Sequence, residues 1–169
     1  SRGAQIAYLD EIGPDSINTE LRKGHTTCIV GVPALWDVLR RRILAPFAER
    51  SQRVEDLVTA LIDAAHLLRE DTGVNVGPAI FLPVHTALGG RIRYLISGAS
   101  ALSETTWKTF RGLGFHIAQG YGLTESAPVL TVTPRDGPVP IGSVGKPLPG
   151  IDIRIVDPDA AGVGEVAAK

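Results

Sequence analysis

The residues best suited to chemistry lie together in one short stretch, Gly120 to Glu125, which reads GYGLTE. Its two glycines allow the backbone to approach a ligand closely, because they carry no Cβ and tolerate positive φ. Between them, Tyr121 offers a flat ring on which a planar heterocycle can stack. Thr124 has a hydroxyl that can donate to a phosphate oxygen, and Glu125 has the hard oxygen ligand that Mg²⁺ prefers. This combination predicts a nucleotide site.

A structural alternative for the same stretch is a tight turn around a buried tyrosine, because two glycines one residue apart are a weak motif. A second loop of small residues, Ser97 to Ser100, favours the functional interpretation. The dinucleotide fingerprint fails, because position 125 is Glu rather than glycine. A hydrolase nucleophile elbow also fails, since no second glycine follows Ser100 at the required spacing.

The cysteine and the histidines indicate no disulfide, nucleophile or metal site. Cys28 is the only cysteine, which excludes an internal disulfide. It lies in an apolar run, and we expect a small buried hydrophobe rather than a nucleophile. The four histidines show no metal-ligand spacing, so we expect them at the surface or in satisfied core positions.

Strands that alternate with helices are expected to position the two loops. The patterns predict strands at 4–9, 27–32, 92–97 and 116–119, and helices at 14–23, 33–43, 54–68 and 104–112. The run at 27–32 is typical of a fully buried strand. Residues 73–88 are expected to form a loop with a short helical turn. Such alternation predicts a parallel sheet with right-handed crossovers, in which ligands bind beyond the carboxyl ends of the strands. Because both loops follow strands, they are expected on one rim.

The pattern changes after residue 128, and we expect a boundary near residues 137 to 150. Residues 129–132 and 151–156 are expected to be strands, the second half-buried and antiparallel, and the final GEVAAK to begin another. The predicted fold class is therefore α/β. Residues 1–137 form a parallel-sheet βαβ subdomain fragment. Residues 138–169 form a linker and the start of a β-rich, barrel-like subdomain.

Composition narrows the function classes. The net charge of the 169 residues is −1, which argues against a nucleic-acid partner, because such partners are usually met by a basic surface. The longest nearly uninterrupted apolar run, 28–36, contains a proline and is shorter than the roughly 20 residues of a spanning helix. No signal peptide is visible. Methionine is absent even at position 1, so we expect a piece of a longer protein.

Three runs together resemble a known family. The run GYGLTES, preceded by LISGASALS and followed by GSVGKPLPG, resembles the adenylate-forming, AMP-binding superfamily of acyl-activating enzymes. Three further features are similar to its long-chain fatty acyl-CoA synthetase branch: TCIVGVPALWDVLRRRI, the helical insert at 50–68, and FLPVHTALGGRIRYLISG. The resemblance covers essentially the whole chain and places it within the large N-terminal domain of that family.

The resemblance implies a role for each matching residue. Catalysis would rest on Thr124, donating to the α-phosphate of ATP, and on Glu125, holding Mg²⁺. The adenine pocket would comprise Gly98, Ala99, Ser100, Gln119, Gly120, Tyr121 and Gly122, with the ring of Tyr121 against adenine. Candidates for the acyl tunnel are Gly31, Val32, Trp36, Ala127 and Pro128. In one departure, many relatives have two glycines in the first loop, whereas here Ala99 and Ser100 follow a single Gly98.

The implied reaction is that of a long-chain fatty acid–CoA ligase. The fatty carboxylate and ATP give an acyl-adenylate and diphosphate, and CoA then displaces AMP. Two alternatives stay open: a fatty acyl-AMP ligase or other carboxylate adenylase, and a non-catalytic nucleotide-binding module. The family's phosphate loop, ribose-binding aspartate, catalytic lysine and C-terminal domain would lie outside these residues, so the isolated chain is expected to be inactive. The resemblance implies a cytoplasmic protein; peripheral membrane association and the oligomeric state are left open.

Overall fold

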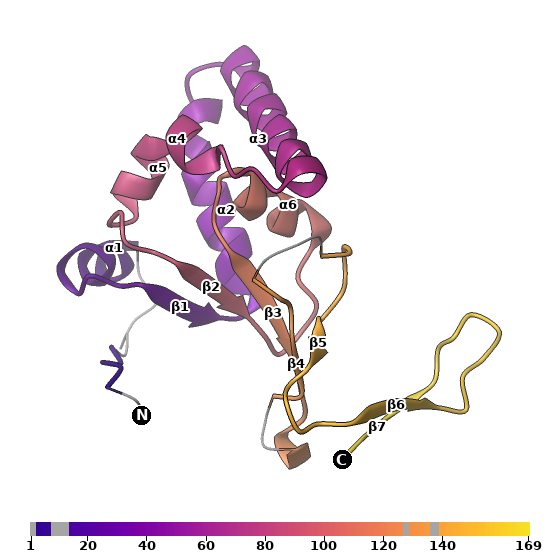
Figure 1. The fold of residues 1–169 in the computed structure, drawn as a ribbon. Coiled ribbons are helices and arrows are strands. Elements are labelled where there is room, and N and C mark those ends of the chain that lie inside the picture. Colours follow the sequence, from indigo (N-terminus) through magenta and orange to yellow (C-terminus); the bar gives the residue numbers. More distant parts are fainter. Residues whose placement is uncertain (1–2, 8–13, 127–128, 136–138) are drawn as a thin grey trace.

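The computed structural model describes residues 3–7, 14–126, 129–135 and 139–169 (Figure 1). The helices are α1 (Pro14–Lys23), α2 (Pro33–Ala48), α3 (Gln52–Thr72), α4 (Gly77–Ile80), α5 (Leu82–Ala87), α6 (Glu104–Gly112) and the 3₁₀ turn η1 (Thr124–Ser126). The strands are β1 (Cys28–Gly31), β2 (Tyr94–Ser97), β3 (Ile117–Tyr121), β4 (Thr131–Val132), β5 (Lys146–Pro147), β6 (Ile153–Val156) and β7 (Glu165–Ala168).

Five of the described strands form one sheet in the order β1-β2-β3-β4-β5. β1, β2 and β3 are parallel, whereas β4 and β5 are antiparallel additions at the far side. β6 and β7 form a separate antiparallel hairpin that projects from the rest of the chain (Figure 1). The predicted α/β class with a parallel sheet is confirmed.

The long helices begin and end where local chemistry favours it. The Ser51 hydroxyl accepts a hydrogen bond from the backbone N–H of Val54 and so caps the N-terminus of α3. α3 ends at Gly73, whose φ of 76° is the left-handed conformation common after a helix. Ser103 caps α6 in the same way, through the N–H of Thr106. The sequence predictions of these two helices are confirmed.

The core lies between one face of the sheet and the helices α2, α3 and α6. Trp36 of α2 and Phe110 of α6 meet edge to face, with ring centroids 6.1 Å apart. Leu95 of β2 and Ile117 of β3 are buried against the same cluster. Trp107 and Phe110 lie three residues apart on the inner face of α6, as its sequence predicts. This packing fixes the sheet beneath the loops that follow β2 and β3.

The structure corrects the prediction of a buried strand at 27–32. β1 lies at the edge of the described sheet, and its side chains alternate between half-buried and exposed. Ile29 faces the helical core, whereas Val30 is 73% exposed on the opposite face. The expectation of a buried Cys28 is also wrong, because this side chain is exposed in the first position of the edge strand. Partial burial still raises the pKa of the Cys28 thiol, which disfavours the nucleophilic thiolate.

Two other segments differ from expectation. Residues 4–7 form no strand and are exposed, since none of the described strands pairs with them; residues 8 and 9 lie outside the described residues. Residues 73–88 hold two short helices, α4 and α5, rather than a loop with one turn. A proline in the first turn of each helix accounts for this, because proline is preorganised for that position.

The C-terminal region is strand and turn. β6 and β7 confirm the two strands expected there, but the side chains of both are mostly exposed rather than half-buried. The division into 1–137 and 138–169 stays a prediction. Among the described helices, none combines the length and apolar character needed to cross a bilayer.

Candidate functional site

The sheet register brings the two small-residue loops together. Ser97 pairs with Gly31 on one side and with Gln119 on the other, at the carboxyl ends of β1 and β2 and two residues before the end of β3. Gly98 donates its N–H to the carbonyl oxygen of Gly31 at 3.2 Å. A Cβ at Gly98 would lie only 3.8 Å from the carbonyl oxygen of Gly120. The predicted site residues of the two loops therefore lie on one rim, as parallel strands require.

In the loop 98–100, the residue with positive φ is an alanine and not the glycine. Gly98 and Gly120 do not use positive φ, whereas Ala99 does, with a φ of 72°. The left-handed region costs a residue with a Cβ roughly 1–2 kcal/mol. Ala99 and Ser100 are both exposed. The loop thus presents a strained, accessible backbone turn directly after β2, at the position where the sequence departs from the two-glycine pattern.

The side chain of Gln119 supports the site through hydrogen bonds within the protein. Its side chain is 5% exposed, and its amide oxygen accepts a hydrogen bond from the N–H of Leu102 at 3.3 Å. The amide nitrogen donates to the carbonyl oxygen of Ser143 at 3.4 Å. Gln119 therefore ties the first loop, β3 and the 143–145 segment together, with its side chain turned into the protein.

The second stretch begins as strand rather than loop. Gly120 and Tyr121 pair with Val132 and Thr131 of β4, so β3 extends beyond its predicted end at 119. Both residues are half-buried, as is Gly122. The ring of Tyr121 is consequently carried by the end of a paired strand, which restricts its position more than a free loop would.

Thr124 and Glu125 lie just beyond this strand, in η1, and both are exposed. The turn is closed by Ser126, whose hydroxyl accepts from the N–H of Leu123 at 3.2 Å and donates to its carbonyl oxygen at 3.0 Å. This pair of hydrogen bonds explains why a turn, rather than more strand, presents the hydroxyl and the carboxylate together.

Glu125 is the candidate metal ligand. Among the described residues, no group of three or more His, Cys, Asp or Glu side chains could enclose an ion. A single carboxylate still fits Mg²⁺, which is commonly held by one or two protein carboxylates together with substrate phosphates and water. The exposed carboxylate of Glu125 is therefore chemically compatible with one ligand of a Mg²⁺ ion that also contacts phosphate oxygens and water.

The acyl-tunnel candidates are only partly brought together. A Cβ at Gly31 would lie 3.2 Å from Cζ2 of Trp36, so these two are in contact. Trp36 is fully buried in the core, whereas Val32 is 49% exposed. Ala127 and Pro128 lie outside the described residues.

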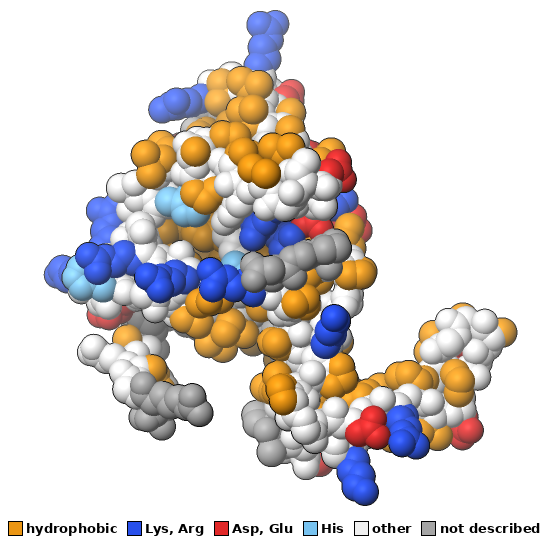
Figure 2. Space-filling model, in the orientation of Figure 1, with side chains coloured by type: hydrophobic (Ala, Val, Ile, Leu, Met, Phe, Trp, Pro, Cys, Tyr) orange, Lys and Arg blue, Asp and Glu red, His pale blue; other side chains and the backbone are white. Residues whose placement is uncertain are grey.

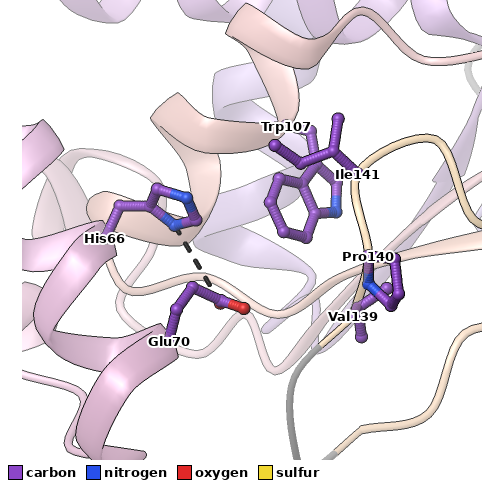
Figure 3. Close-up of a pocket in the computed structure, with 6 residues that line it drawn as sticks. All are labelled: His66, Glu70, Trp107, Val139, Pro140 and Ile141. Atoms are coloured by element: carbon purple, nitrogen blue, oxygen red, sulfur yellow. Dashed lines mark ion pairs between the residues drawn. The ribbon is translucent and has the colours of Figure 1, made fainter.

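A separate hollow of about 310 Å³ lies between α3, α6 and the segment 139–141 (Figure 3). None of its residues was predicted as a site residue, because they come from three distant segments. Burial lowers the pKa of His66 there and so favours the neutral imidazole; Glu70 opposes this shift, and Arg111 acts in the same direction as burial. The lining residues are His66, Glu70, Trp107, Val139, Pro140 and Ile141.

Comparison with known proteins decides the family. The model of a family described as AMP-binding enzyme matches residues 1–168. The chain belongs to this family. Long-chain-fatty-acid–CoA ligase 1 of Schizosaccharomyces pombe is 32% identical over 159 residues, covering 91% of this chain and 23% of that protein. Long-chain-fatty-acid–CoA ligase 2 of the same yeast is 29% identical over 142 residues, covering 82% and 21%.

Solved structures agree in fold. ATP-bound MatB from Rhodopseudomonas palustris matches with a TM-score of 0.58 and 24% identity, over 96% of this chain and 25% of that one. A malonyl-CoA ligase ternary product complex with methylmalonyl-CoA and AMP matches with a TM-score of 0.57 and 24% identity, over 96% of this chain and 28% of that one. The matches thus cover 21% to 28% of the length of these four proteins. The resemblance to the adenylate-forming superfamily is confirmed.

Proposed function

We propose that this chain forms one wall of the ATP site of an AMP-forming long-chain fatty acid–CoA ligase. The observation that carries the proposal is the strand register, which sets Ser97 beside Gln119 and so brings the loop 98–100 against the stretch 120–125. That rim offers, in chain order, the backbone of 98–100, the ring of Tyr121, the hydroxyl of Thr124 and the carboxylate of Glu125. Those are the groups that adenine, an α-phosphate and Mg²⁺ need.

In this proposal each residue binds or orients one part of ATP. Tyr121, held by β4, stacks on the adenine ring, and the backbone of 98–100 lines its edge. The exposed hydroxyl of Thr124 donates to the α-phosphate and holds it for attack by the fatty carboxylate. Bound at Glu125, Mg²⁺ would offset the charge that develops on the phosphate oxygens. The chain's contribution to the first step is thus alignment and charge stabilisation.

The long-chain substrate and CoA are supported by the named relatives, which are long-chain fatty acid–CoA ligases. An acyl-AMP ligase would share the adenylation step and differ only in the acceptor. Both possibilities are separated by one assay: palmitate and ATP with and without CoA, with release of AMP and formation of thioester measured together.

The Glu125→Gln substitution in the full-length protein tests the metal role. We expect acyl-adenylate formation from palmitate to fall on the order of 100-fold or more, because charge stabilisation in the transition state is lost. Diphosphate exchange measures the adenylation step, and circular dichroism checks the fold. Glu49→Gln is the matched control, since Glu49 is an exposed carboxylate at the end of α2. Normal exchange by the Glu125 variant would defeat the assignment.

A further inference from the structure

A row of cationic side chains crosses the face at the amino ends of β1 and β2 (Figure 2). Arg91 and Arg93 immediately precede β2, and Arg22 and Lys23 end α1. All four side chains are exposed. The candidate nucleotide site lies at the carboxyl ends of the same strands. The length of β2, four residues, therefore separates the two places by roughly 13 Å.

A hollow of about 360 Å³ opens beside Arg91 and Arg93, and we call it the arginine hollow. Its lining residues are Thr27, Gly90, Arg91, Ile92 and Arg93. The carbonyl oxygen of Thr27 accepts hydrogen bonds from the N–H groups of Arg93, at 2.8 Å, and Tyr94, at 3.1 Å. These bonds fix the segment before β2 against the segment before β1, so the two arginines are carried by a defined backbone.

Two further cations flank the arginine hollow. A Cβ at Gly89 would lie 2.4 Å from the carbonyl oxygen of Leu21, so the end of α1 lies directly against this loop. Arg22 reaches from there, and its Nε donates to the carbonyl oxygen of Ala87 at 3.4 Å. Arg135 donates to the Tyr94 hydroxyl at 2.8 Å and lies over the ring of Tyr94, the residue that follows Arg93 in the chain. Two more cations are thus held next to residues that line the hollow.

These charges are not neutralised within the described part of the chain. The ion pairs found there join other residues, such as Glu70 with Arg111 and Glu104 with Lys108. One carboxylate, that of Glu20, lies at this end of α1, against Gly24. Within the same described ranges, the backbone N–H groups of Arg91 and Ile92 donate no hydrogen bond. The hollow is therefore lined by two arginines without an ion-pair partner and by two residues whose N–H groups donate no hydrogen bond within the described ranges.

We propose that the arginine hollow binds a phosphate-bearing anion. A planar guanidinium matches a phosphate with two parallel hydrogen bonds, which makes arginine the preferred partner for this group. The Thr27 hydroxyl and the two free N–H groups complete the set of donors. A phosphate of this kind comes either from a soluble compound or from the headgroup of an anionic lipid, and the chemistry at the hollow is the same.

The test replaces both arginines of the hollow, Arg91→Gln together with Arg93→Gln, in the full-length protein. The matched control is Arg41→Gln with Arg42→Gln, which removes the same charge from exposed positions of α2. Inorganic phosphate is titrated calorimetrically, and phosphatidylcholine vesicles with and without phosphatidic acid are used for co-sedimentation. We expect binding to weaken about tenfold or more in the hollow variant, to persist in the control, and to fall as salt rises.

The two arms identify the source of the phosphate. The site is assigned to a lipid headgroup if the protein sediments with phosphatidic acid vesicles, if phosphate competes with this binding, and if the hollow variant loses it while the control keeps it. Saturable phosphate binding without vesicle binding assigns it to a soluble compound. The proposal is overturned if neither probe binds at millimolar phosphate, or if the α2 control loses binding equally. Both arms are independent of adenylation, so failure of the ligase proposal leaves them intact.

Discussion

Ala99 occupies the least favourable backbone conformation at the candidate nucleotide site. Its φ of 72° lies in the left-handed region, which costs roughly 1–2 kcal/mol for a residue with a Cβ. Such strain persists only where the surrounding structure determines the conformation, and it is concentrated at ligand sites. Here β2 on one side and the Gln119–Leu102 hydrogen bond on the other fix the loop.

We expect Ala99→Gly to raise the free energy of unfolding by about 0.5–1 kcal/mol. Relief of the left-handed strain exceeds the larger entropy that glycine has in the unfolded chain. Urea unfolding followed by fluorescence measures the change. Ala101→Gly is the control, because Ala101 is exposed in the same loop and has no positive φ; it should lower stability. Equal destabilisation by both substitutions would show that the strain at Ala99 is not an energetic cost.

The stretch 119–125 shows which residues of the candidate site the sequence could predict. Tyr121, Thr124 and Glu125 are adjacent in the chain, so their common location followed directly from the motif. The expected part of Gln119 in the adenine wall stays a prediction; what the sequence did not indicate is that its side-chain amide bonds within the protein. Its partners lie 17 and 24 residues away in the chain, and no local pattern could have indicated them.

At the scale of elements, α3 and α6 are joined by an ion pair between a buried arginine and a half-buried glutamate. Arg111 is 3% exposed and donates from Nε to Glu70 Oε1 at 2.9 Å, with a second bond from a terminal nitrogen. Its guanidinium also lies over the ring of Trp107, 4.9 Å from the centroid. Arg69 reinforces the junction by donating to the carbonyl oxygens of Arg111 and Phe115.

A double-mutant cycle on Glu70→Ala and Arg111→Met should show strong coupling. Removing Glu70 alone leaves a buried guanidinium unpaired, for which we expect a loss of about 3 kcal/mol. The double variant should lose clearly less than the sum of the single variants. Stability is measured by urea unfolding. The comparison cycle uses Glu104→Ala and Lys108→Ala, whose side chains are 55% and 37% exposed, and should give about 0.5 kcal/mol or less. Similar coupling in both pairs would contradict the special role of the buried pair.

The elements themselves divide into those that local sequence specifies and those that it does not. α3 and α6 each have an apolar face and a serine cap, and both helices were predicted. The type of β1 was also predicted, but its burial was not. An apolar run of this composition is the same whether one face or both faces of a strand are covered. The position of β1 at the edge depends on pairings elsewhere in the fold.

At the scale of the whole molecule, the candidate site is open. Thr124 and Glu125 are exposed at the end of a strand. The chain spans only 21% to 23% of its two yeast relatives. Among the described residues, no group of three or more His, Cys, Asp or Glu side chains, with or without Glu125, could hold a metal ion. In the proposed function, we therefore expect this rim to contact one side of a nucleotide, with the remaining contacts made by residues outside the described ranges.

We expect the 169-residue chain on its own to bind ATP weakly and to show no adenylation of fatty acids. Alignment of two substrates supplies much of the rate enhancement in such a reaction, and it requires contacts on both sides of the reacting phosphorus. Diphosphate exchange with palmitate measures adenylation, and the full-length protein assayed in parallel is the positive control. Circular dichroism of the isolated chain separates loss of activity from loss of fold. Exchange above background by a folded, isolated chain would show that this single wall is sufficient, and the division of labour proposed here would then be wrong.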